Sequence, residues 1–265
     1  MKPIGIIGGT GFDRFVKNGS SSREVSTNYG SPSSPVFSLG IGNREVKFIY
    51  RHGRSDGKRI PPQFVNYAAN MKALSDEGCE NILVTTAVGD LILPENVGKL
   101  AIPHQLINYT EGRRRTLYDN RIVHVEFADP YCGRLRQMMV KKGHELEISM
   151  LDDGIVAVVS GNNFSTRAEH SRFKKDGCTI VGMTQYPESV FARELGLCYV
   201  AVAIVTDYAI NLQSPPDIRE TTHEEVVNKF AVSVGNVTHL LEELVPQIPD
   251  ERNCPCSTAL KRAIY

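Results

Sequence analysis

Polar residues follow the apolar runs of this sequence, and several are of the kinds that bind an anion. They are Thr10 after "IGIIGG", Arg51 and His52 after "VKFIY", Thr86 after "NILVT", and Thr184 after "TIVGM". Guanidinium, imidazole and hydroxyl groups, together with the backbone N–H groups of a glycine-rich turn, are donors that can cradle a phosphate. The residue types therefore predict a phosphate site if the fold brings these positions together.

Each of these residues alone also has a structural explanation, as a surface arginine, a satisfied threonine or a tight turn. The Gly-Gly-Thr-Gly turn lacks the full spacing of a dinucleotide-binding loop, and about twenty residues on only Glu24 supplies an acidic group. In an open α/β sheet, however, the carboxyl ends of the strands gather at one edge. That convergence favours a phosphate cradle, while for the opening turn a plain strand-to-loop connection stays open.

A carboxylate follows another apolar run in the same manner. Asp207 comes directly after "YVAVAIVT", where an unpaired buried carboxylate would be costly. Such a position makes Asp207 a candidate for catalysis or for substrate recognition. The alternative is a cap of the turn that follows the strand.

These candidate residues are attached to a regular alternation of strand-like and helix-like segments. Strands are expected at 4–8, 46–53, 81–90, 99–107, 154–161, 179–184 and 198–209, and helices at 65–78, 166–177, 187–196 and 222–242. The last helix opens with a Thr222–Glu225 capping box. The alternation predicts one α/β domain over residues 1–265, with a mixed, mostly parallel central sheet flanked by helices.

Composition narrows the class of partner. Thirty basic and thirty acidic residues cancel, which argues against nucleic acid or an anionic membrane as the main partner and favours a small molecule. No leader-like segment and no long apolar run occur, so we expect a cytoplasmic protein that does not span a membrane.

The six cysteines suggest no disulfide framework. Cys79, Cys132, Cys178 and Cys198 stand singly in patterned segments, and we expect them to be buried packing residues. Cys254 and Cys256 form a C-x-C pair that is too close for an unstrained disulfide and that offers too few ligands for a metal. We assign this pair no function from the sequence.

Seven segments carry a resemblance to a known family. They are "IGIIGGTG", "RHG…IPPQFVNYAAN", "VTTAVG", "HVEFADPYC", "FSTRAE", "GMTQYPE" and "VTDYA", in this order over nearly the whole chain. The chain resembles the methylthioadenosine phosphorylase branch of the trimeric purine nucleoside phosphorylases. The resemblance implies that orthophosphate, a co-substrate, attacks C1′ of a purine nucleoside and releases the base and a ribose 1-phosphate. It implies no cofactor and no metal, and a homotrimer with sites at the subunit interfaces.

The resemblance also assigns roles to residues. Phosphate would be bound by Thr10, Arg51, His52, Thr86, Ala87 and Thr184, with Asp207, Arg51 and His52 as the catalytic residues. Met183 would lie beneath the ribose, Phe164 would stack on the base, and Asp207 would contact N7 and the 6-amino group. His124 would reach a neighbouring subunit's site, and Val226 and Val227 would line the 5′ pocket.

Three departures from the family pattern affect the substrate. Ala209 stands where a second aspartate is usual, Gly161-Asn162-Asn163-Phe164 replaces Gly-Pro-Arg-Phe, and His223 begins the closing helix with a group suited to a 5′-hydroxyl. The leading substrate is S-methyl-5′-thioadenosine. The first alternative is a phosphorylase for other nucleosides, either 5′-hydroxy nucleosides such as adenosine, inosine or guanosine, or methylthioinosine. The second is a nucleoside-binding protein without turnover, and the third is a nucleoside hydrolase.

Overall fold

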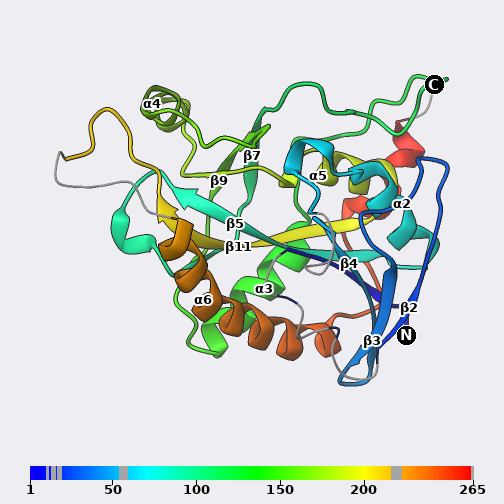
Figure 1. Ribbon diagram of the computed structural model, residues 1–265. Coiled ribbons are helices and arrows are strands. Elements are labelled where there is room, and N and C mark those ends of the chain that lie inside the picture. Colours follow the sequence, from blue (N-terminus) through cyan, green and yellow to red (C-terminus); the bar gives the residue numbers. More distant parts are fainter. Residues whose placement is uncertain (10–11, 13–15, 17–19, 54–58, 216–222, 264–265) are drawn as a thin grey trace.

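Figure 1 shows the computed structural model, in which a twisted sheet lies between two groups of helices. The structure describes residues 1–265 except 10–11, 13–15, 17–19, 54–58, 216–222 and 264–265, and for 223–232 and 262 it describes the backbone only. The predicted α/β fold class, with a mixed sheet flanked by helices, is confirmed.

The described residues form one 11-stranded sheet. Its strands are β1 (Ile4–Gly8), β2 (Ser21–Arg23), β3 (Val36–Ile41), β4 (Arg44–Tyr50), β5 (Asn81–Asp90), β6 (Leu100–Ala101), β7 (Gln105–Tyr109), β8 (Met150–Leu151), β9 (Ile155–Val159), β10 (Ile180–Gly182) and β11 (Cys198–Tyr208). The main path runs β2-β3-β4-β1-β5-β10-β9-β7, and β11 adds to β5 and carries β6 and β8. The central pairs β4/β1, β1/β5 and β5/β11 are parallel, whereas β5/β10 is antiparallel.

The long strand β5 changes neighbours partway along its length. It pairs with β1 as far as Val84 and with β10 only from Gly89, while β11 accompanies it throughout. Residues 85–88 therefore have no described strand partner on the β1/β10 side. This interruption leaves room for polar side chains beside the middle of a central strand.

Helices cover both faces of the sheet (Figure 1). They are α2 (Tyr67–Asp76), α3 (Gly133–Glu145), α4 (Arg167–Lys175), α5 (Gln185–Glu194) and α6 (His223–Leu244), with short 3-10 turns η1 (Pro62–Phe64), η2 (Pro94–Asn96), η3 (Val245–Gln247), η4 (Pro255–Thr258) and η5 (Leu260–Arg262). Helices α2 and α5 pack together, as Met71 and Phe191 share one buried cluster. Helices α3 and α6 pack together on the other side, where Leu135 and Leu240 share another.

Local sequence explains where several helices begin. The side chain of Asn66 accepts a hydrogen bond from the Ala69 N–H and caps α2. Thr166 and Glu169 form a reciprocal capping box at the start of α4. The predicted Thr222–Glu225 box lies outside the described residues, although α6 covers the predicted closing helix.

Two expectations about elements were wrong. The strand expected over 99–107 is divided into β6 and β7, because Pro103 has no N–H for a sheet ladder. Helix α3 was missed, although Leu135 and Met139 are four positions apart and both buried, as a helix facing the core requires. Among the described helices, none combines the length and hydrophobicity needed to cross a bilayer.

Candidate active site

Thr86 and Thr184 meet at the interruption in β5. Their hydroxyl oxygens lie 3.0 Å apart, and both side chains are buried. Thr86 comes from β5, and Thr184 from the residue between β10 and α5. The neighbouring Ala87 is exposed although it lies in the middle of a central strand. The paired hydroxyls thus lie beside the one exposed residue of β5, and they meet because the antiparallel strand β10 ends opposite the middle of β5.

Arg51 lies at the carboxyl end of β4 and is 1% exposed. Its backbone N–H donates to the Gly8 carbonyl of β1 at 2.9 Å. The guanidinium Nε and Nη2 donate to the two carboxylate oxygens of Glu188 at 2.5 and 3.1 Å, and Nη1 donates to the Thr85 carbonyl at 2.7 Å. Arg51 is therefore an internal partner of helix α5 and of β5, next to the two threonines. Direct contact between Arg51 and phosphate stays a prediction.

Glu188 was missed by the sequence reasoning. It is fully buried, and it also accepts a hydrogen bond from the Tyr199 hydroxyl at 2.9 Å. A buried ion pair of this kind holds the guanidinium in one orientation, because removing either partner leaves an uncompensated charge in the interior. Its sequence signal was weak, since an acidic residue in the first turn of a helix such as α5 is common.

His52 is partly buried beside Arg51. Its Nδ1 faces the Ile60 carbonyl at 2.9 Å, so that Nδ1 carries the proton and donates. Burial, and after it the positive charge of Arg51, lower the pKa of His52 below its usual 6.5. The imidazole is accordingly neutral at pH 7, and its Nε2 has a lone pair that can accept a hydrogen bond.

A β-bulge orients Asp207. Val205 pairs with Val88 and Asp207 with Gly89, which leaves Thr206 as the extra residue of β11. The Thr206 hydroxyl donates to Asp207 Oδ1 at 2.7 Å. A Cβ atom at Gly89 would lie only 2.8 Å from Asp207 Oδ2, so the glycine makes room for the carboxylate. Asp207 is thus fixed on the strand next to the interruption in β5.

Arg113 is a second residue that the sequence did not reveal. Its buried guanidinium donates from Nη1 to the carbonyls of Met183 and Tyr186 at 2.8 and 2.6 Å, and from Nη2 to the Ser160 carbonyl at 2.6 Å. It therefore ties the turn that contains Met183 and Thr184 to the end of β9. One arginine in the run "EGRRRT" gives no sequence signal for such a role.

The loop after β9 differs in its exposure from the other candidate positions. Gly161 has a φ of +80°, and a Cβ atom there would lie 2.5 Å from the Met183 sulfur, so the loop packs directly on Met183. Asn162 has a φ of 119°, an unusual value for a residue other than glycine. Phe164, the expected stacking residue, is 74% exposed. Stacking of Phe164 on a base stays a prediction.

The other predicted residues lie apart from this group or outside the described part. His124 is exposed on the segment between β7 and α3, and its backbone N–H donates to the Ala263 carbonyl at 3.0 Å. Thr10 and the side chains of His223, Val226 and Val227 lie outside the described residues.

The C-terminal cysteine pair has partners that the sequence did not suggest. The sulfur atoms of Cys132, Cys198, Cys254 and Cys256 all lie within 4.8 Å of one another. The C-x-C pair alone offers two ligands, and the fold adds the residue before α3 and the first residue of β11, which the sequence did not suggest. Cys79 and Cys178 are buried, as expected.

Comparison with known proteins identifies the family of this chain. The family described as the phosphorylase superfamily matches residues 3–246. The chain is 39% identical over 264 residues to an S-methyl-5′-thioadenosine phosphorylase of Thermofilum pendens, covering 98% of each chain. It is equally 39% identical over 272 residues to a probable 6-oxopurine nucleoside phosphorylase of Thermococcus kodakarensis, covering 99% of each.

A solved structure shares the whole fold. The methylthioadenosine phosphorylase of Schistosoma mansoni in complex with adenine superposes with a TM-score of 0.89 at 32% identity, covering 99% of this chain and 97% of the other. The resemblance drawn from the seven sequence segments is confirmed, and the chain belongs to the phosphorylase superfamily.

Proposed function

We propose that this protein cleaves a purine nucleoside by phosphorolysis, with S-methyl-5′-thioadenosine as the leading substrate and adenine and 5-methylthioribose 1-phosphate as products. The observation that carries the proposal is the buried Thr86–Thr184 hydroxyl pair beside the exposed Ala87. Hydroxyl groups fixed by the fold are suited to a tetrahedral oxyanion, and a hydrolase would need no such group for water.

Phosphate is held in this proposal by groups that lie in or follow four strands. When phosphate binds, Thr86 and Thr184 exchange their mutual hydrogen bond for donation to phosphate oxygens, and Thr10 adds a third hydroxyl. His52 accepts the phosphate's own P–OH hydrogen at Nε2, because its neutral form has a lone pair there. Arg51 supplies positive potential from the adjacent interior. Phosphate is a co-substrate here, and the chemistry requires no cofactor.

Bond cleavage separates charge between the sugar and the base. Positive charge develops at C1′, as in other glycosidic cleavages, and the bound phosphate stabilises it before attacking that carbon. Negative charge develops on the purine, and a protonated Asp207 donates a hydrogen bond to N7. Met183 lies beneath the ribose. Phe164, in the loop that follows β9, stacks on the base when a nucleoside is bound.

A second candidate is phosphorolysis of 5′-hydroxy nucleosides or of methylthioinosine. It is favoured by Ala209, which is buried and supplies no second carboxylate to the base, and by His223 at the start of α6. Relatives named for 6-amino and for 6-oxopurine substrates are about equally similar to this chain, so identity does not separate the two candidates.

The assembly proposed with this function is a cytoplasmic homotrimer in which His124 reaches a neighbour's nucleoside site. The exposure of His124 and of the large apolar side chains of Ile122 and Phe64 supports it. Light scattering on the purified protein tests it: a monomer mass would contradict the proposal.

A substrate panel tests the function. Base release is measured for methylthioadenosine, adenosine, inosine, guanosine and methylthioinosine, each with and without orthophosphate. The proposal expects phosphate-dependent release, fastest with methylthioadenosine, whereas preference for inosine or guanosine would establish the second candidate. Binding of a nucleoside without any release would instead identify a binding protein that has lost turnover.

A further inference from the structure

Three segments far apart in the sequence bring four cysteine sulfurs together. Cys132 immediately precedes α3, Cys198 is the first residue of β11, and Cys254 and Cys256 lie at the start of η4. All four sulfur atoms lie within 4.8 Å of one another, and all but Cys254 are buried. The sulfur atoms of Cys198 and Cys254 lie 3.3 Å apart. We call this group the cysteine cluster.

The spacing of these atoms fits a single tetrahedral ion. Zinc–sulfur bonds of about 2.3 Å at tetrahedral angles put the sulfurs about 3.8 Å apart, within the spread of the cluster. Four thiolates without nitrogen or oxygen ligands favour zinc among the common cellular metals. We propose that the cysteine cluster binds one zinc ion as a structural tetrathiolate site.

A positively charged side chain beside the cluster would stabilise thiolates. Four thiolates around a divalent ion carry two excess negative charges, and Arg134 lies beside them with Nη2 3.8 Å from the Cys198 sulfur. The Nε and Nη1 atoms of Arg134 are buried and have no hydrogen-bond partner among the described residues. N–H groups that donate to metal-bound sulfur are a usual outer contact of such sites.

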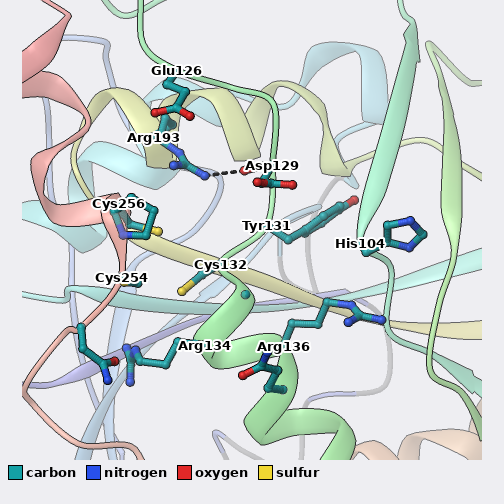
Figure 2. A pocket seen from close by; sticks show the side chains of 14 residues that line it. His104, Glu126, Asp129, Tyr131, Cys132, Arg134, Arg136, Arg193, Cys254 and Cys256 are labelled. Carbon is teal, nitrogen blue, oxygen red and sulfur yellow. Dashed lines mark hydrogen bonds between the residues drawn. The ribbon is translucent and has the colours of Figure 1, made fainter.

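The cluster can be reached from solvent. Cys132, Cys254 and Cys256 line one end of a cavity of about 570 Å³, together with Arg134 and Arg193 (Figure 2). An ion can therefore enter the folded protein. Once bound by four protein ligands, it has no open position for a substrate, so the site stabilises the fold and performs no chemistry.

The position of the cluster supports a structural role. Cys198 is at the beginning of β11, whereas Asp207 is near its other end. Zinc bound at the cluster would link the C-terminal residues and the start of α3 to the beginning of β11. This site is separate from the threonine pair. The proposal does not depend on phosphorolysis, and its test uses no activity measurement.

The test combines metal content, thiol counts and cobalt spectra on the full chain purified without oxygen. We expect about one zinc per chain in the wild-type protein, and visible and charge-transfer bands of tetrahedral cobalt thiolate after exchange with Co²⁺. The Cys254→Ala/Cys256→Ala double variant should lose both signals. The matched control, Cys79→Ala/Cys178→Ala, changes two buried cysteines outside the cluster and should keep both.

Two results would overturn the proposal. One is a metal-free protein whose four cluster cysteines are paired in disulfides, shown by thiol counts that rise only after reduction. The other is a reduced cluster that neither retains zinc nor develops the cobalt bands. If the double variant does not fold, the cobalt titration of the wild-type protein and of the control variant is sufficient to test zinc binding. Both of these proteins keep all four cluster cysteines.

Discussion

The hydroxyl oxygens of Thr86 and Thr184 lie 3.0 Å apart although 98 positions separate these residues in the sequence. The contact exists because β5 exchanges β1 for β10 at this point, which brings the residue after β10 to the middle of β5. The proposed phosphate site depends on this pair more than on any single residue.

Replacing either hydroxyl should weaken phosphate binding. For Thr86→Val or Thr184→Val we expect the phosphate KM to rise roughly 10- to 150-fold, because a hydrogen bond to a charged group contributes about 1.5–3 kcal/mol. Initial rates at varied phosphate measure the effect. Thr85→Val is the matched control, since the Thr85 hydroxyl is buried without a partner among the described residues and its loss should leave KM unchanged. Equal effects at all three positions would remove the pair from the site.

Asp207 should affect turnover rather than phosphate binding. Asp207→Ala is expected to lower kcat by about 10²- to 10³-fold, the usual effect of losing one group that stabilises transition-state charge, with little change in the phosphate KM. Thr206→Val, which removes the hydroxyl bonded to Asp207 Oδ1, should lower kcat less because the carboxylate stays in place. Near-normal turnover of Asp207→Ala, measured with the preferred nucleoside, would exclude it from the mechanism.

The buried ion pair between Glu188 and Arg51 should stabilise the folded protein. Glu188→Gln leaves the Arg51 guanidinium buried without its counter-charge, and we expect a loss of about 3–5 kcal/mol in the free energy of unfolding. Urea denaturation measures it. Asp76→Asn removes a carboxylate from an exposed pair with Lys72 and should change the free energy of unfolding by less than about 1 kcal/mol. Similar values for the two variants would mean that the buried pair does not constrain Arg51.

His52 should make stability depend on pH in the acidic range. Its pKa in the folded protein is lowered below 6.5, so the unfolded chain binds a proton more readily. The contribution of neutral His52 to the free energy of unfolding is fully present above pH 6.5. It is lost as the pH falls toward the pKa of His52 in the folded protein. His52→Gln should flatten this dependence in unfolding free energies measured across the window. His239→Gln, at an exposed histidine, should not.

Much of the fold and part of the site could be predicted from local patterns. Thr86, Thr184 and Asp207 directly follow apolar runs, which was enough to single them out, although the contact between the two threonines arises from the antiparallel pairing of β10 with β5 and not from parallel strands that end at one edge. Glu188, Arg113 and the partners of the C-x-C pair were not predictable in this way. Their contacts join segments whose neighbourhood depends on strand order and helix packing, which no single segment encodes. Pro103 could have divided the 99–107 strand in advance, since proline breaks a central ladder.

The most direct test of the central claim is the product formed from the preferred nucleoside in the presence of orthophosphate, followed by phosphorus NMR alongside base release. The account predicts one sugar 1-phosphate for each base released, and no base release when phosphate is omitted. Base release at the same rate without phosphate, with free sugar as the product, would contradict it and identify a hydrolase.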